Sequence, residues 1–406
     1  MSNNLVYTKR LIRKSSSRII IPLIISLSLV IRSSLFIRRR AAEDYSSVDA
    51  SNGIAIVLIF LSLPYIFSTK GIQVIKLLFK SKIRIYLYFV LWSLVSVLWS
   101  TNVIYSAFRG VELLINLFLI GYIFYNIPSR IYAKKILMIY FLISIVAGIG
   151  FYFKHFGFSF VNFHTNSYSM IAAAAIIIGY GIKNESKSTD PFKLKRTSIV
   201  LMAVSIFCLI VGTSGASNAS FLFVILFLFV MKRNSFISFL FLFLVSLISY
   251  FLWISFQDQI LNIVFPGKKL ESIQTGTGRK GMWAIYLDGF LQKPIFGFGF
   301  PTGEKEGDRF GWMVTSSSHN MLISAAINSG IIGLSLLLAF LIKYYNYCRK
   351  MWLVLGYTEF RWILGGFLII AINSLSLPAI GSTWMWMTSP IYCLFVYSVF
   401  NYKLKW

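Results

Sequence analysis

Hydrophobic residues occur along this chain in long, continuous runs that short polar and basic segments separate. Runs such as 54–67, 236–256 and 321–342 contain no charged residue. A membrane-spanning helix needs about 20 mostly apolar residues, and lipid tolerates only helices or closed barrels. Because the runs are continuous rather than alternating, they predict helices. The pattern therefore predicts an all-α polytopic membrane protein.

The runs predict about twelve transmembrane helices and one large external loop between the ninth and the tenth. The chain would then divide into an N-terminal membrane bundle of about nine helices (1–256), the large loop with short helices (257–318) and about three C-terminal membrane helices (319–406). The predicted spans are 19–37, 53–67, 83–99, 107–125, 136–153, 166–182, 197–212, 219–231, 236–256, 319–342, 361–377 and 384–400.

Composition and charge support a membrane protein. The chain is 57% hydrophobic and 13% charged, and its mean hydropathy is +0.74. The net charge of +26 does not indicate a nucleic-acid partner, because the basic residues lie in the gaps between spans. With the N-terminus inside, the predicted cytoplasmic segments hold 26 of the 39 Lys and Arg residues, as expected for loops on that side. Arg38–Arg40 would fall outside, so either the first span is misplaced or later spans determine the orientation.

The sequence contains neither a recognisable signal peptide nor a cysteine motif. Residues 1–18 are polar and basic, so no cleavable signal peptide is expected. The three cysteines have no spacing typical of metal ligands and predict neither a zinc site nor a disulfide framework: Cys208, Cys348 and Cys393.

The predicted loop contains a glycine-rich turn, 274–283, followed by an expected amphipathic helix, 280–292, that Pro294 ends. Its apolar face would comprise Trp283, Tyr286, Leu287, Phe290 and Leu291. Glycine lets a backbone approach a ligand closely, a helix N-terminus offers free N–H groups to an anion, and the Arg279 guanidinium matches phosphate oxygens. A phosphate site and an interfacial helix that contacts lipid headgroups both fit these residues.

The second motif, 316–320, lies just before an apolar span. His319 can accept a proton near neutral pH, and one of the serines 316–318 could cap the following helix. A histidine held by a carbonyl at the membrane surface fits as well. An acidic run in the same loop predicts a solvated loop tip rather than a metal site: Glu304, Glu306 and Asp308. A cation and a base in one external segment suit glycosyl transfer from a lipid pyrophosphate sugar.

With these motifs the chain resembles the O-antigen ligase and polymerase superfamily of bacterial envelope proteins. The resemblance covers roughly residues 90–340. It rests on segments in order: Leu98-Trp99-Ser100-Thr101-Asn102, Ser106-Ala107-Phe108-Arg109-Gly110, Phe163-His164-Thr165-Asn166-Ser167, Gly278-Arg279 with Trp283, 293–299, and Ser318-His319-Asn320 with Gly330-Ile331-Ile332-Gly333.

The resemblance implies an inverting-type, metal-independent glycosyltransferase without a cofactor, in the bacterial inner membrane with its site facing the periplasm. The implied substrates are an undecaprenyl pyrophosphate-linked oligosaccharide and an acceptor, either a glycan or lipid A–core, with membrane lipids around the protein. It implies that Arg279 binds the pyrophosphate and that His319 activates the acceptor.

One departure concerns a second arginine that the family often carries upstream. In the matching stretch, 212–220, Asn218 stands in its place and brings no charge. Another cation could substitute, from Lys280, Lys268 or Arg109, or the activity could differ. Arg109 and Glu112 are three residues apart on one helix, so they are expected to pair. Further candidates for substrate binding are His164, supported by Asn166, and Asn320.

Two acceptors and one other class of protein remain open. The Trp-Ser and His-x-Asn segments favour an exopolysaccharide or O-antigen polymerase, and the alternative is a ligase. A transporter or flippase is the other class. Transport sites favour polar residues near mid-membrane, whereas the ionisable residues here mostly avoid the span centres.

Overall fold

The computed structural model describes residues 19–32, 50–156, 166–185, 191–212, 214–231, 279–305, 317–381 and 383–403. These residues form helices joined by turns, and no strand occurs among them. The predicted all-α class is therefore confirmed for this part of the chain. The ninth predicted span, Arg38–Arg40 and much of the predicted large loop lie outside the described residues.

The helices follow the predicted runs closely. Their bounds are Ile19–Ile31, α2 (Ala50–Phe67), α3 (Thr69–Lys80), α4 (Arg84–Val95) with a 3-10 turn at Ser96–Trp99, α5 (Val103–Asn126), α6 (Arg130–Phe156), α7 (Asn166–Glu185), α8 (Pro191–Val211), α9 (Gly215–Val230), α12 (Arg279–Gln292), α13 (Thr302–Lys305), α14 (Met321–Leu353), α15 (Glu359–Asn373) and α16 (Met385–Lys403).

Among the described helices, four are long and apolar enough to cross a membrane: Val103–Asn126, Arg130–Gly150, Leu194–Val211 and Met321–Leu353. A fifth results if α2 and α3, which meet at 87°, count as one broken span. Other predicted spans correspond to shorter helices, such as Gly215–Val230 and Met385–Phe400. The membrane class is supported, and the number of twelve spans stays a prediction.

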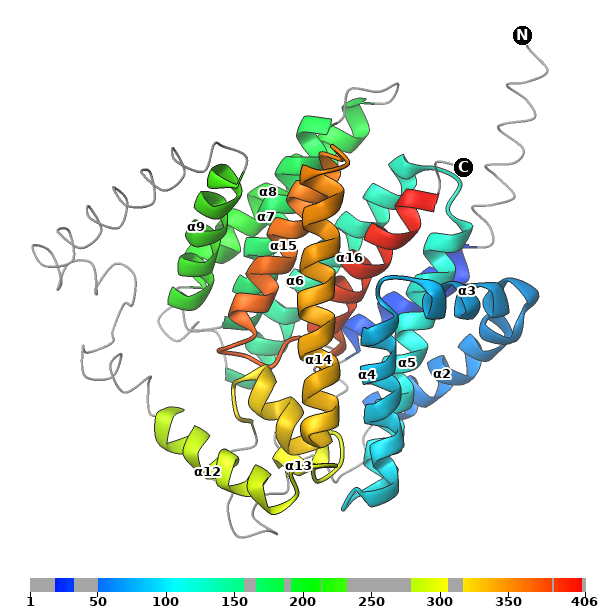
Figure 1. The fold of residues 1–406 in the computed structure, drawn as a ribbon. Coiled ribbons are helices and arrows are strands. Elements are labelled where there is room, and N and C mark those ends of the chain that lie inside the picture. The colour runs from blue at the N-terminus through cyan, green and yellow to red at the C-terminus, as the bar shows by residue number, and fades with distance from the viewer. Residues whose placement is uncertain are drawn as a thin grey trace, which may run out of the picture.

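The C-terminal helices pack against the N-terminal ones. α14 contacts α4, α15 contacts α7 and α9, and α16 contacts α5 and α6 (Figure 1). Every residue from 385 to 400 of α16 is buried. A helix that is apolar on all sides is typical of a buried position, so α16 forms the centre of the packing.

α14 is broken near its N-terminal end, at Gly330. This glycine has φ 65° and ψ −168°, which lies outside the helical region. A Cβ atom there would lie 2.0 Å from the carbonyl oxygen of Ile295, so only glycine fits. The short first part of α14, with α12 and α13, lies at one end of the bundle (Figure 1).

Candidate functional site

α12 places Arg279 in its first turn, as the glycine-rich turn predicted. The Arg279 side chain is partly buried, and its Nη1 donates to the carbonyl of Ser376 (3.3 Å). One turn later, Trp283 Nε1 donates to the carbonyl of Ser318 (2.8 Å). These two bonds hold the start of α12 against the turn before α14 and the turn after α15.

The predicted apolar face of α12 is confirmed for Trp283, Tyr286 and Phe290, which pack in one hydrophobic cluster, and is wrong for two leucines. Met282 and Tyr286 are buried against the first part of α14, where they contact Ile327. Leu287 and Leu291, which were expected on that face, are 48% and 69% exposed. Residues four apart stack on one face, so the pair 282 and 286 selects a face that leaves 287 and 291 outside.

His319 lies in a tight turn before α14. Its φ of 51° is in the left-handed region, which few non-glycine residues adopt. The Ser317 hydroxyl accepts from the His319 N–H (3.3 Å). The Ser318 hydroxyl donates to the carbonyl of Asn320 (3.0 Å). Such a conformation persists only where the surroundings determine it, so the imidazole position is built into the turn.

The helix cap after His319 is not a serine. Asn320 is the N-cap, and its Oδ1 accepts from the N–H groups of Leu322 (2.8 Å) and Ile323 (3.3 Å). Asparagine is among the best capping residues. The expected cap by one of the serines 316–318 is therefore wrong, and the Oδ1 of Asn320 already has partners.

The sequence suggested a solvated loop tip for Glu304, and this prediction is wrong. Glu304 lies in α13 and is only 7% exposed. Its Oε1 accepts from the backbone N–H of Ser318, and its Oε2 accepts from the hydroxyl of Ser324 in α14 (2.6 Å). The Glu304 N–H donates to Asn328 Oδ1 (2.9 Å). The alternating charges around Glu304 did not indicate that its carboxylate is buried. Glu306 and Asp308 lie outside the described residues.

Burial and two charged side chains shift the pKa of His319. Burial lowers the pKa of His319 below its usual 6.5, the charge of Arg279 lowers it further, and the charge of Glu304 opposes both. Burial also lowers the pKa of Arg279, although a guanidinium stays protonated at any physiological pH. The imidazole is therefore held towards its neutral form, in which it can accept a proton.

The last residue of α15 and the turn that follows it, residues 373–376, join the other parts of the site. The Ser374 carbonyl accepts from the Met321 N–H (2.8 Å), and the Ser376 carbonyl accepts from Arg279. Asn373 bonds with two serines of α9, Ser217 (3.0 Å) and Ser220. Asn218 stands between these serines and is partly buried. The turn thus connects the stretch around Asn218 with Arg279 and His319.

The segment after α12 fits into the break of α14. The N–H groups of Phe298 and Gly299 donate to the carbonyls of Ile327 (2.8 Å) and Asn328 (3.0 Å). The Ile331 N–H donates to Pro294 (2.7 Å), and Trp92 Nε1 donates to Ser329 (2.9 Å). Backbone groups that the kink frees from the helix therefore find partners, as apolar surroundings require. This docking fixes α12 and α13 relative to His319.

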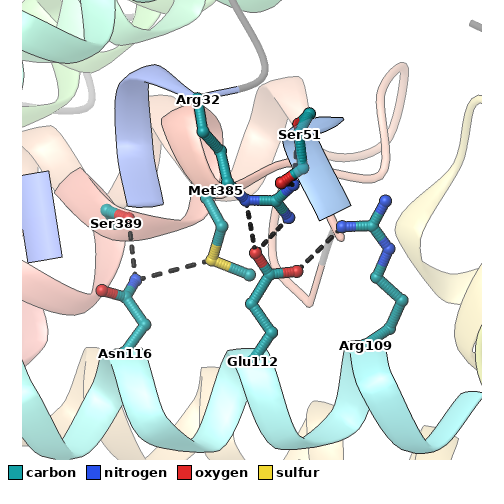
Figure 2. A network of polar contacts seen from close by, with 7 residues as sticks. All are labelled: Arg32, Ser51, Arg109, Glu112, Asn116, Met385 and Ser389. Atoms are coloured by element: carbon teal, nitrogen blue, oxygen red, sulfur yellow. Dashed lines mark hydrogen bonds and ion pairs between the residues drawn. The ribbon is translucent and has the colours of Figure 1, made fainter. Parts of the chain in front are cut away.

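A second polar group lies within the bundle, on α5. Figure 2 shows Glu112 between two arginines: Arg32 Nε donates to Oε1 (2.9 Å), and Arg109 Nη1 donates to Oε2 (2.8 Å). All three side chains are buried. Arg32 also bonds the hydroxyl of Ser51 (3.1 Å). The predicted pair of Arg109 and Glu112 is confirmed, and these residues are exceptions to the expectation that ionisable groups avoid the spans.

The same face of α5 continues to Asn116, whose Nδ2 donates to Ser389 of α16 (2.8 Å) (Figure 2). Towards the other end of α5, Ser100 Oγ lies 2.6 Å from Ser106 Oγ and 2.7 Å from Thr302 Oγ1 of α13. α5 therefore carries a buried polar stripe that reaches the segment next to Glu304.

The structure brings together Arg279, His319 and, through the 373–376 turn, the stretch of Asn218. His164, Lys268 and the side chain of Lys280 lie outside the described residues, and so does the side chain of Asn166. The sequence did not single out Asn373, Ser376 or Arg32 as part of either polar group. Among the described residues, no group of three His, Cys, Asp or Glu residues is close enough to hold a metal ion.

A family model described as O-antigen ligase matches residues 198–338 of the chain. The matched segment runs from α8 to the middle of α14, and so includes Asn218, Arg279, Glu304 and His319. No curated protein matches the chain in a sequence comparison. The matched segment is therefore similar to the O-antigen ligase family, in agreement with the resemblance that the sequence motifs indicated.

Proposed function

We propose that this protein transfers a glycan from undecaprenyl pyrophosphate to a sugar hydroxyl at the periplasmic face of the bacterial inner membrane. The single observation that carries the proposal is the pairing of Arg279 and His319 at one site. Trp283 Nε1, one turn after Arg279, donates to the carbonyl of Ser318, the residue before His319 (2.8 Å), and the guanidinium lowers the pKa of the imidazole. A fixed cation beside a neutral base is the pair that this reaction needs.

In the proposed reaction, the acceptor hydroxyl attacks the anomeric carbon (C1) of the donor sugar. His319 takes the hydroxyl proton while the bond from C1 to the acceptor oxygen forms. The bond from C1 to the phosphate oxygen breaks, and its electron pair stays on the pyrophosphate. Arg279 stabilises this growing negative charge. A direct displacement of this kind inverts the configuration at C1, and it needs no metal ion.

Other residues are proposed as substrate contacts. Asn218 can donate a hydrogen bond to a phosphate oxygen, and Asn373 holds the neighbouring serines of α9. Arg109, Lys280, His164 and Asn320 remain proposals for the same role. Of these, Arg109 already shares the carboxylate of Glu112 with Arg32.

We favour a polymerase, in which the acceptor is the sugar of another lipid-linked repeat, because of the Trp-Ser and His-x-Asn segments. A ligase that transfers the glycan to lipid A–core is the second candidate, and the description of the matching family model favours it. Deleting the gene and examining the surface glycan separates the two. Single-repeat decoration indicates a lost polymerase, and a lipid-linked polymer that accumulates unattached indicates a lost ligase.

The test of the reaction is His319→Ala in a glycan-transfer assay with purified protein. Transfer should fall by roughly a hundredfold or more, because the base is lost, while the protein stays folded in the membrane. Arg279→Lys should also lose most activity, because an ammonium group cannot form the two parallel bonds of a guanidinium. Asp288→Ala, which changes an exposed residue of α12, is the control. Full transfer by the His319→Ala protein would exclude the proposed base.

A further inference from the structure

Glu304 is the one described carboxylate that acts electrostatically on His319 and is also bonded to the turn that holds it. The carboxylate accepts the N–H of Ser318, the residue directly before His319. It also accepts the hydroxyl of Ser324, one turn into α14 (2.6 Å). Both of its oxygens are therefore bound on the two sides of His319.

Glu304 is itself held rigidly. Its N–H donates to Asn328 Oδ1 (2.9 Å), and Asn328 lies just before the break of α14 at Gly330. The hydroxyl of Thr302, in the same short helix, is paired with Ser100. The carboxylate is thus fixed to both α14 and the segment before α5, so its position does not depend on a bound substrate.

The left-handed backbone of His319 needs neighbouring bonds that hold it in place. An unfavourable φ persists only where neighbouring bonds impose it. The bond from Ser318 N–H to a carboxylate is charge-assisted, and such bonds are roughly twice as strong as neutral ones. The carboxylate therefore contributes a strong constraint on the turn directly beside the imidazole.

We propose that Glu304 is a positioning residue for His319: its carboxylate holds the left-handed turn and supplies a negative charge that opposes the effect of Arg279 on the imidazole. This inference rests on the proposed function, because it assigns His319 the role of base. Among the described residues packed around the imidazole, Arg279 of α12 and Glu304 of α13 are the charged groups that act on it. The turn 373–376 and the first turn of α14 contain none.

Two variants separate the two contributions of Glu304. Glu304→Gln keeps an oxygen for the Ser318 N–H and a donor for the Ser324 hydroxyl, but it removes the charge. Glu304→Ala removes both the charge and the bonds. Asp288→Asn, which removes an exposed carboxylate of α12, is the matched control for charge alone.

The pH profile gives the readout that a purely structural role would not move. The charge of Glu304 raises the pKa of His319, so its removal should lower that pKa further. A base works above its pKa, so the acidic limb of the transfer profile should shift to lower pH in Glu304→Gln. The limb should stay in place in Asp288→Asn. Glu304→Ala should lose roughly a hundredfold in rate at every pH, because a misplaced base costs about that much.

A direct titration of His319 keeps this inference separate from the proposed function. Diethyl pyrocarbonate modifies neutral imidazoles, so its rate against pH reports the pKa of His319 in a His155→Gln, His164→Gln background. Glu304→Gln should lower the midpoint of that curve. If the wild type transfers no glycan but the midpoint shifts, the proposed function fails and the effect of Glu304 on His319 stands. An unshifted midpoint in Glu304→Gln, or a wild-type rate in Glu304→Ala, would overturn the positioning role.

Discussion

At the scale of single residues, the bundle contains a carboxylate shared by two cations. Glu112 binds Arg32 and Arg109 with different oxygens, so the group carries one net positive charge within α5 and its neighbours. A charged side chain at membrane depth is costly, and such residues are usually functional. Here it also joins three segments of the chain, because Arg32 reaches Ser51 at the start of α2.

Glu112→Gln should destabilise the protein by about 3–5 kcal/mol, because it leaves two buried guanidinium groups without their counter-charge. The measurement is thermal or denaturant unfolding of the purified protein in detergent. Glu359→Gln is the matched control: its ion pairs with Arg130 (3.5 Å) and Lys134 (3.8 Å) are more exposed, so the loss should be about 1 kcal/mol or less. Equal stability of Glu112→Gln and the wild type would contradict a structural role for the shared carboxylate.

Local spacing explains which residue contacts could be predicted. The pair of Arg109 and Glu112 followed from their separation along one helix. Arg32 could not be assigned to the same group, because it lies 80 residues away from Glu112. Glu304 was mistaken for a solvated residue, because its neighbours in the sequence are charged. Its partners, Ser318 and Ser324, lie 14 and 20 residues further along the chain.

At the scale of elements, the break in α14 is the feature that assembles the site. The segment 294–299 inserts its backbone where the helix opens, and Gly297 and Gly299 there have φ of 69° and 100°. Helix existence and approximate bounds followed from the apolar runs. The break was not predicted, although Asn328-Ser329-Gly330 interrupts the apolar run with a Ser-Gly pair that is typical of turns.

Gly330→Ala should displace the segment 294–299 and remove transfer activity. A Cβ atom would meet the Ile295 carbonyl at 2.0 Å, and the φ of 65° is unfavourable for alanine. The expected result is a transfer rate at least tenfold lower, with the loop newly sensitive to limited proteolysis. Gly53→Ala in α2, where a Cβ atom meets nothing within 4 Å, should leave both unchanged or stabilise its helix slightly. Normal activity of Gly330→Ala would mean that the break can close without consequence.

At the scale of the whole molecule, the C-terminal helices complete the bundle that begins at the N-terminus. α16 is buried between α5 and α6, and its Ser389 bonds Asn116 of α5 (2.8 Å). The hydropathy pattern predicted these helices but not their neighbours. The packing partners of a uniformly apolar helix cannot be derived from its own sequence, because it has no polar face that fixes its orientation.

A chain that ends at residue 382 should fail to fold, because α5, α6 and α7 would each lose contacts with α16. Exposing that buried surface removes close packing from the centre of the molecule. The expected result is degradation in cells or aggregation in size-exclusion chromatography, compared with the full chain in the same membrane preparation. Co-expression of residues 383–406 as a separate segment should restore part of the folded protein. A monodisperse truncated protein would show that α16 is dispensable.

The docking of 294–299 onto the break of α14 also sets an order for biogenesis. While the ribosome is still making residue 326, the acceptor carbonyls at Ile327 and Asn328 and the donor at Ile331 do not yet exist. Until then, the N–H groups of Phe298 and Gly299 and the carbonyl of Pro294 must stay hydrated. The proposed site can close only after the following helix has been synthesised, so the growing polypeptide lacks the assembled site during most of its insertion.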